Sequence, residues 1–118
     1  MKDIAGGSVV VVTGAGRGMG ACHAKLLSER GHAVVCLDRN RDAARSVAEQ
    51  CGPLAYPVCA DVTDSASLEC AVAAALDDLG RIDAIVANAG ITTGGAEETW
   101  EMDERDWQLV LDVNLTGV

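Results

Sequence analysis

Apolar residues along the chain form short continuous runs that alternate with longer segments of mixed polarity. The first run, residues 9–12, consists entirely of valine and is followed by a glycine turn, which is typical of a strand buried on both faces of a parallel sheet. Three more runs predict strands at residues 33–37, 54–59 and 82–87. Pro57 places the third strand at an edge of the sheet, because proline lacks the N–H that a central strand donates.

Between these runs, apolar positions recur every three or four residues, which predicts a helix after each strand. The expected helices cover residues 18–30, 41–50, 64–79 and the segment from 103 onwards. Gly31 and Gly80 end the first and third helices, and Thr63 and Asp103 are the N-caps of the third and fourth. The side chains expected to face the core are Met19, Cys22, Leu26 and Leu27, then Ala44, Val47 and Ala48, then Leu68, Val72, Ala75, Leu76 and Leu79. The polar, glycine-containing segment 91–95 predicts a loop.

Strand and helix therefore alternate four times without a linker, which predicts a single α/β domain over residues 1–118. Such alternation favours a doubly wound parallel sheet with right-handed crossovers and helices on both faces. The polar or glycine residues that follow the strands are Gly14, Asp38, Asp61 and Asn88. Because ligands of doubly wound sheets bind at the carboxyl edge, we expect the functional site there.

The segment between the first strand and the first helix is rich in glycine. Its residues are Thr13, Gly14, Ala15, Gly16, Arg17, Gly18, Met19 and Gly20. Glycines allow a tight turn and a close approach of backbone to ligand, and the unpaired amides of a helix start attract an anion. A phosphate would fit there, although an ordinary strand-to-helix turn could have the same composition.

Asp38 follows the second strand, where a carboxylate can accept hydrogen bonds from the ribose hydroxyls of an adenosine. Its charge would repel a 2′-phosphate, which favours NAD over NADP. Arg17 and Arg39 point the other way, because a guanidinium near the ribose would pair with that phosphate. We give the carboxylate more weight, while a role for Asp38 as a loop or capping acid stays open.

The amino-acid composition limits which partners the protein is expected to bind and in which compartment it is expected to occur. Acidic residues outnumber basic ones 18 to 9, and the net charge of −9 would repel nucleic acid and anionic membrane surfaces. The five cysteines are odd in number and form no Cys-x-x-Cys pair, so we expect reduced thiols in a cytoplasmic protein. We expect no metal site, because His23 and His32 have no clustered ligands beside them. Lys2 and Asp3 open a segment that does not resemble a signal peptide.

These motifs together resemble the N-terminal, cofactor-binding part of a short-chain dehydrogenase/reductase. The family's Thr-Gly-x-x-x-Gly-x-Gly motif is matched by Thr13, Gly14, Gly18 and Gly20. The more general G-x-G-x-x-G spacing fails at Met19, which favours this family over other dinucleotide-binding folds. The resemblance implies a Rossmann-type sheet of order 3-2-1-4, an NAD(P) cofactor, and a secondary alcohol or ketone as substrate.

The resemblance also assigns roles to the remaining site residues. Asp61 and Val62 match the pair that contacts adenine in this family. Asn88, Ala89 and Gly90 match its Asn-Ala-Gly motif, whose backbone lies along the adenosine ribose and whose asparagine helps to hold the central strands. Asn114 matches the helix asparagine of the family's proton relay, although an amide on an apolar helix face is usually a hydrogen-bonded core residue. The acid at Asp38 is typical of NAD-preferring members, whereas Arg17 is more frequent in NADP-preferring ones.

The chain departs from the family in its catalytic residues. The serine and the Tyr-x-x-x-Lys motif of family members follow the asparagine helix, whereas these 118 residues contain one tyrosine, Tyr56, with Ala60 four positions later. We therefore expect a truncated or fragmentary chain that is inactive alone, leaves the fourth strand as an apolar edge, and forms a homo-oligomer if complete. The alternative is a non-catalytic dinucleotide-binding or interaction module that completes its sheet with another chain. A methyltransferase is disfavoured by the 88–90 motif and the glycine spacing.

Overall fold

The structure is a computed structural model that describes residues 6–94 and 98–118. Its strands are β1 (Val9–Thr13), β2 (Ala33–Asp38), β3 (Ala55–Cys59) and β4 (Ala84–Val86), and its helices are α1 (Gly18–Glu29), α2 (Arg41–Cys51), α3 (Ser65–Leu79) and α4 (Glu104–Leu111). A 3₁₀ turn, η1 (Thr99–Glu101), precedes α4, and a π-helical turn, η2 (Asp112–Thr116), follows it. All strand pairs are parallel and the order is β3-β2-β1-β4, which confirms the predicted Rossmann-type α/β sheet.

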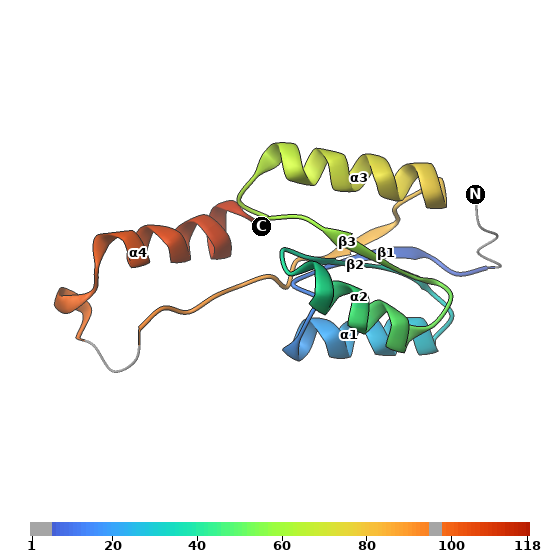
Figure 1. The fold of residues 1–118 in the computed structure, drawn as a ribbon, viewed down its shortest axis with the longest axis horizontal. Helices are drawn as coiled ribbons and strands as arrows, with labels where there is room; N and C mark the ends of the chain where they lie inside the picture. The colour runs from blue at the N-terminus through green and yellow to red at the C-terminus, as the bar shows by residue number, and fades with distance from the viewer. Residues whose placement is uncertain (1–5, 95–97) are drawn as a thin grey trace.

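The four valines of β1 supply both halves of the core. Val9 and Val11 pack with buried residues of α3, whereas Val10 and Val12 pack with buried residues of α1 and α2. Figure 1 accordingly shows α3 on one side of the sheet and α1 and α2 on the other. The prediction of a central strand buried on both faces is confirmed, and β3 with Pro57 lies at an edge as expected.

Helix α1 faces the core with small residues. Gly20 and Ala24 are buried, whereas Met19 is 73% exposed, and Leu26 and Cys22 are also exposed. The predicted inward face is therefore wrong at these three positions. The reason is that α1 starts in direct contact with the glycine turn, so only the least bulky side of the helix can lie against the sheet.

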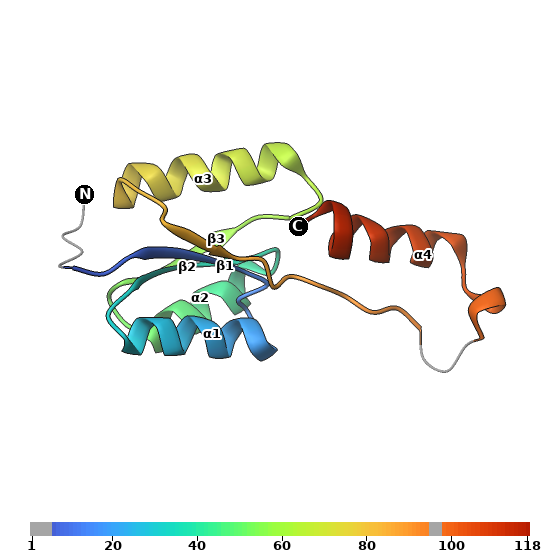
Figure 2. The same cartoon turned by 180° about the vertical axis from the view of Figure 1, so that it is seen from behind.

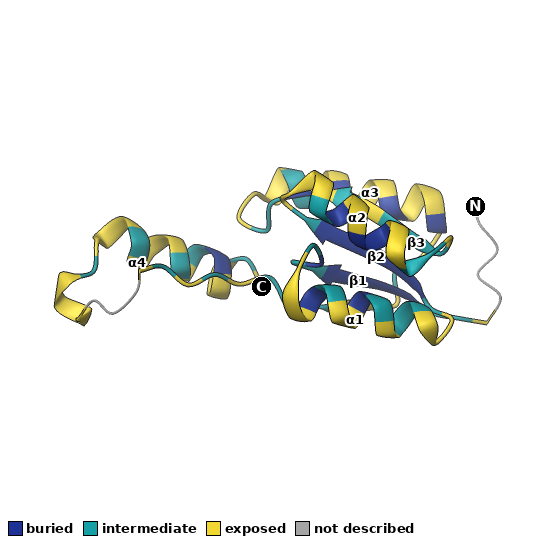
Figure 3. Ribbon diagram, turned by 60° about the horizontal axis from the view of Figure 1, so that its bottom comes forward, coloured by how far each residue is buried: buried dark blue, intermediate teal, exposed yellow. Residues whose placement is uncertain are grey.

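The inward faces of α2 and α3 agree better with the sequence pattern. In α2 the predicted residues Ala44, Val47 and Ala48 are all buried. In α3 the buried residues are Ala71, Ala75 and Leu79, while the predicted Val72 and Leu76 are exposed on the outer side of the helix. Figure 3 shows this outer side of α3 largely exposed.

Helix α3 begins at Ser65 with Asp64, not Thr63, as its N-cap. The Asp64 carboxylate accepts a hydrogen bond from the Ala66 N–H at 3.1 Å. The prediction of Thr63 as the cap is wrong because its N–H and hydroxyl both bind Asp61 Oδ1, at 2.9 and 2.7 Å. Asp103 does cap α4, where it accepts from the Arg105 N–H.

Strand β4 is shorter than its apolar run and pairs on one side only. It lies beside β1 in the described sheet, and Ile85 is 63% exposed. The pairing stops at Asp83, whose Oδ2 accepts from the Val9 N–H at 2.7 Å and whose carboxylate also binds Arg81. The expected apolar edge is therefore present in the part of the chain that the structure describes.

Helix α4 projects away from the sheet, as Figures 1 and 2 both show. It is tied to the body through η2, where Val113 is buried. The expected apolar face of this helix is largely exposed at Trp107, Leu115 and Val118. The π-helical turn was not indicated by the sequence pattern.

Two features of the sequence lie outside the described residues. They are Gly95, at the end of the expected loop 91–95, and the N-terminal pair Lys2 and Asp3. Within the described ranges, every helix is too short or too polar to cross a bilayer.

The five cysteines should differ sharply in reactivity. Cys36 is fully buried in β2, and this burial raises the pKa of its thiol to about 12, whereas Cys22, Cys59 and Cys70 are exposed. Because the thiolate is the nucleophile, iodoacetamide at pH 8 is expected to modify the exposed cysteines first and Cys36 only after unfolding. Peptide mass spectrometry over time measures this order, and labelling of Cys36 as fast as Cys22 would contradict it.

Candidate functional site

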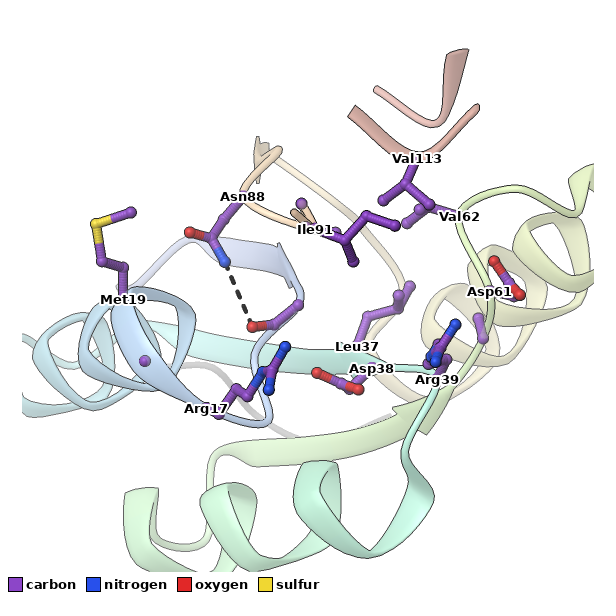
Figure 4. A pocket seen from close by; sticks show the side chains of 15 residues that line it. Arg17, Met19, Leu37, Asp38, Arg39, Asp61, Val62, Asn88, Ile91 and Val113 are labelled. Carbon is purple, nitrogen blue, oxygen red and sulfur yellow. Dashed lines mark hydrogen bonds between the residues drawn. The ribbon is translucent and has the colours of Figure 1, made fainter. Parts of the chain in front are cut away.

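A cavity of about 280 Å³ lies at the carboxyl edge of the sheet. It is formed where the glycine turn, the ends of β2 and β3, the segment after β4 and the turn η2 meet (Figure 4). The predicted site residues that line it are Gly14, Arg17, Gly18, Met19, Asp38, Arg39, Asp61, Val62, Asn88, Ala89 and Gly90. Thr13, Gly16, Gly20 and Asn114 do not line this cavity.

Two glycines outside the cavity lining are required by close packing behind it. A Cβ on Gly20 would collide with the Gly14 carbonyl oxygen and would lie 2.6 Å from Asn88 Nδ2. A Cβ on Gly16 would lie 2.7 Å from Ala43 Cβ and 2.8 Å from Asp38 Oδ2. Real Cβ atoms do not approach other atoms this closely, so both positions support the shape of the turn.

The start of α1 adjoins the cavity, which Gly18 and Met19 line, and the first amides of a helix have no acceptor within the helix. Arg17 is the N-cap in an extended conformation, and its side chain makes no capping hydrogen bond. The first turn of α1 also contains no acidic residue that could complement the amides. The positive end of the helix is therefore available to an anion.

Acidic and basic side chains alternate along the other wall. Arg17 and Arg39 lie on either side of Asp38 in Figure 4, with Asp61 beyond Arg39. Hydrogen bonds from the Thr63 N–H and hydroxyl hold the pKa of Asp61 below its ordinary value, and the nearby Arg39 lowers it further. Asp61 is therefore ionised at neutral pH. This arrangement places hydrogen-bond acceptors next to cations that could pair with a phosphate.

Thr13 and Asn88 join the glycine turn to the segment after β4. Thr13 Oγ1 accepts from the backbone N–H groups of Asn88 and Ala89, both at 3.0 Å. The Asn88 side-chain amide donates to the carbonyl oxygens of Thr13 at 3.0 Å and Gly14 at 3.3 Å, the latter drawn in Figure 4. These contacts hold two walls of the cavity at a fixed separation.

Replacing Thr13 by valine should test this link. Valine removes the acceptor of two partly buried amides, so we expect a loss of about 2 kcal/mol in the free energy of unfolding, measured by urea denaturation. Serine at the same position keeps the hydroxyl and should lose less than about 1 kcal/mol. Equal losses in the two variants would mean that the hydroxyl does not carry the effect.

Asn114 lies in η2, on the far side of the segment after Gly90. Its Oδ1 accepts from the Ile91 N–H at 2.8 Å and its Nδ2 donates to the Ile91 carbonyl at 2.9 Å. Both functions of the side-chain amide are thus used by backbone. Asn114 also lines a second, mostly apolar cavity of about 340 Å³ between residues 91–93 and α4.

The cavity has four lining residues that the sequence reading missed. They are Leu37, Ala60, Ile91 and Val113. The first three adjoin predicted site residues in sequence, so their positions at strand ends could have indicated them. Val113 also adjoins a predicted site residue, Asn114, but it follows no strand and reaches the cavity through the turn η2, which the pattern did not indicate.

Comparison with known proteins gives consistent matches over nearly the whole chain. A family model described as short chain dehydrogenase matches residues 8–118. The chain is 37% identical over 126 residues to trans-4-hydroxycyclohexanecarboxylate dehydrogenase of Sinomonas cyclohexanicum, covering 99% of this chain and 48% of that protein. It is 39% identical to 3-alpha-(or 20-beta)-hydroxysteroid dehydrogenase of Mycobacterium tuberculosis, covering 95% of this chain and 42% of that one.

A solved structure shares the fold closely. A 3-ketoacyl-(acyl-carrier-protein) reductase from Brucella melitensis, complexed with NADH, superposes with a TM-score of 0.90 and 35% identity. The match covers 94% of this chain and 45% of the reductase. The chain thus spans about half the length of the relatives that it matches.

Proposed function

Because the chain belongs to the short-chain dehydrogenase/reductase family, whose model matches residues 8–118, we propose that it is the dinucleotide-binding domain of an oxidoreductase. The reaction is hydride transfer between NAD and a secondary alcohol or its ketone. The observation that carries this proposal is the cavity at the carboxyl edge, where the uncapped start of α1 lies beside the Asp38 carboxylate. In this proposal residues 1–118 form that domain, and the matched part covers 48% of the Sinomonas dehydrogenase and 45% of the Brucella reductase.

The residues present fit a dinucleotide. The turn holds backbone close to backbone at positions where a Cβ would intrude, and no side chain caps the start of α1 that follows it. In this proposal the pyrophosphate lies against the glycine turn, the adenosine ribose against Asp38, and adenine near Asp61 and Val62. The residues assigned to cofactor binding are Thr13, Gly14, Gly16, Arg17, Gly18, Met19, Gly20, Asp38, Arg39, Asp61, Val62, Asn88, Ala89 and Gly90.

NAD is the preferred cofactor in this proposal. The Asp38 carboxylate would face a 2′-phosphate at short range, and this like-charge contact opposes NADP. Arg17 and Arg39 also line the cavity and would reduce the preference for NAD over NADP. The NADH bound to the Brucella reductase is consistent with the cofactor class.

The cofactor supplies or accepts the hydride, while the substrate oxygen needs a proton donor or acceptor from the protein. The serine and Tyr-x-x-x-Lys of the family are absent from these 118 residues. Asn114 is assigned to the relay that serves that tyrosine in the family, and its side chain holds the Ile91 backbone here. We therefore propose that the 118-residue chain binds cofactor without turning over substrate by itself.

Thermal unfolding with NAD, NADP and S-adenosylmethionine tests the proposed ligand. A ligand present at a hundred times its dissociation constant adds about 2.7 kcal/mol to the stability of the state that binds it. The proposal expects the largest upward shift with NAD, a smaller one with NADP and none with S-adenosylmethionine. A shift with S-adenosylmethionine alone would favour a methyltransferase. Absorbance of reduced cofactor with a panel of secondary alcohols should stay flat, and clear turnover would refute the claim of inactivity.

A second candidate function is an interaction module that completes its sheet with another chain. The exposed Ile85 on the edge strand β4 and the exposed Trp107 and Leu115 on the projecting part favour it. The same surfaces support our proposal that the protein forms a homo-oligomer. We also propose that it is cytoplasmic, because its free cysteines would stay reduced there. Sedimentation, together with cofactor titration, tests this second candidate, because a monomer without cofactor affinity would contradict the module.

A further inference from the structure

The Asp38 carboxylate has backbone partners on both of its oxygens. Its Oδ2 accepts a hydrogen bond from the Gly16 N–H at 2.9 Å, and its Oδ1 accepts from the Asn40 N–H at 2.9 Å. Gly16 lies 22 positions earlier in the chain, in the middle of the glycine turn. The side chain at the end of β2 thus reaches across to the turn that follows β1.

The glycine turn is held from two sides. On one side, the Asn88 amide binds the carbonyl oxygens of Thr13 and Gly14. On the other side, the Ala15 N–H donates to the Leu37 carbonyl at 3.1 Å, and the Gly16 N–H donates to Asp38. The Asp38 contact is the last of these before the chain enters α1 at Gly18.

The space around Gly16 fits this contact closely. A Cβ at position 16 would lie 2.7 Å from Ala43 Cβ and 2.8 Å from Asp38 Oδ2, so the turn rests directly against the end of β2 and the start of α2. Loss of the carboxylate would leave the Gly16 amide without its acceptor. The direction in which the following amides enter α1 would then be less well defined.

We propose that Asp38 is a positioning residue for the glycine turn: its carboxylate holds the Gly16 amide and so directs the first amides of α1 into the cavity. This inference rests on the proposed function, in which phosphates bind at that helix start. It adds a second role to the acid assigned to the ribose. The adenosine ribose and the pyrophosphate of a bound dinucleotide would be coupled through one carboxylate.

The positioning role can be separated from a simple effect of charge, because the two predict opposite signs. Removing a carboxylate from the cavity wall takes away one negative charge, which by itself should strengthen the binding of any anion. Removing the support of the turn should weaken it. Asp61 is a matched control, since it lines the same cavity but its hydrogen bonds stay between β3 and α3: its side chain accepts from Thr63, and its backbone N–H donates to Ser67.

Inorganic pyrophosphate is the probe, because it lacks the adenosine that Asp38 would contact directly. Titrations of ¹⁵N-labelled wild type, Asp38→Ala and Asp61→Ala would follow the amide signals of residues 18–20. We expect Asp38→Ala to bind pyrophosphate at least fivefold more weakly than wild type, and Asp61→Ala to bind it equally or more tightly. Unchanged or tighter binding by Asp38→Ala would overturn the positioning role and leave the proposed function intact.

Amide hydrogen exchange gives a readout that needs no ligand. We expect the Gly16 amide to exchange at least tenfold faster in Asp38→Ala than in wild type, with no change in Asp61→Ala or in the β1 amides of either variant. Asp38→Asn, which keeps one acceptor oxygen, should give an intermediate rate and serves as a second variant. An unchanged Gly16 rate would overturn the inference. Failure of wild type to bind pyrophosphate would instead count against the proposed function, while the exchange data still decide the role of Asp38.

Discussion

Replacing Gly20 by alanine is expected to weaken NAD binding about 100-fold, equivalent to about 2.7 kcal/mol, and to destabilise the fold by about 3 kcal/mol. The added methyl would collide with the Gly14 carbonyl oxygen and lie 2.6 Å from Asn88 Nδ2. These atoms are backbone and a hydrogen-bonded amide, so they cannot move away without breaking the link from Asn88 to the turn. The cavity would lose its shape at the point assigned to the pyrophosphate.

Gly31→Asn is the matched control for this substitution. Gly31 has a φ of +84° and open space where a Cβ would lie, and it is far from the cavity lining. Because asparagine tolerates this conformation better than other residues, the control should lose less than about 1 kcal/mol and bind NAD normally. Calorimetric titration and urea denaturation measure both quantities. Wild-type affinity in Gly20→Ala would show that the tight contact behind the turn does not support the site.

Replacing Asp38 by asparagine is expected to raise the affinity for NADP relative to NAD about 30-fold. Two unit charges about 5 Å apart at an effective dielectric constant of about 20 interact by about 3 kcal/mol, and salt reduces this to about 2 kcal/mol. Arg17 and Arg39 remain in the cavity lining to pair with the 2′-phosphate. Any weakening of the glycine turn lowers the affinities for NAD and NADP alike, so it cancels in the ratio of the two affinities.

Asp61→Asn controls for the change in net charge. It lines the same cavity beyond Arg39, and the proposal assigns it to adenine, which is common to both cofactors. The ratio of the two affinities should therefore change less than about threefold. Equal changes in the two variants would mean that the general field of the cavity, and not contact at Asp38, decides between NAD and NADP.

The architecture was predictable because its main determinants are local. The four valines of β1 have alternate side chains on opposite faces, and this requires apolar residues along a strand that is covered on both sides. Proline at position 57 excluded a central place for β3. The strand ends that carry Gly14, Asp38 and Asn88 meet at one edge simply because the strands are parallel.

The errors arose where contacts between distant segments outweigh the local pattern. Met19 and Leu26 have helical spacing for an inward face, but the contact between Gly20 and the turn rotates α1 so that Gly20 and Ala24 lie inside. Thr63 has the residue type of an N-cap, but the neighbouring Asp61 uses its hydroxyl.

The sequence predicted which residues belong to the site better than it predicted what each residue does there. Most of the residues chosen from the motifs line one cavity. However, Thr13 and Gly20 act behind the lining, where one accepts hydrogen bonds and the other leaves room for a carbonyl. The side-chain amide of Asn114 makes both of its hydrogen bonds with the backbone of Ile91, which lies 23 positions away and which no spacing rule identifies.

Titration of the ¹⁵N-labelled 118-residue chain with NAD, followed by two-dimensional NMR, tests most directly whether the carboxyl-edge cavity binds a dinucleotide. The predicted result is saturable shifts of the amide signals at residues 14–20, 38–39, 61–62 and 88–90, with the outer sides of α2 and α3 unaffected. Absence of saturable shifts at millimolar NAD, or shifts confined to other surfaces, would contradict the assignment of this cavity to the cofactor.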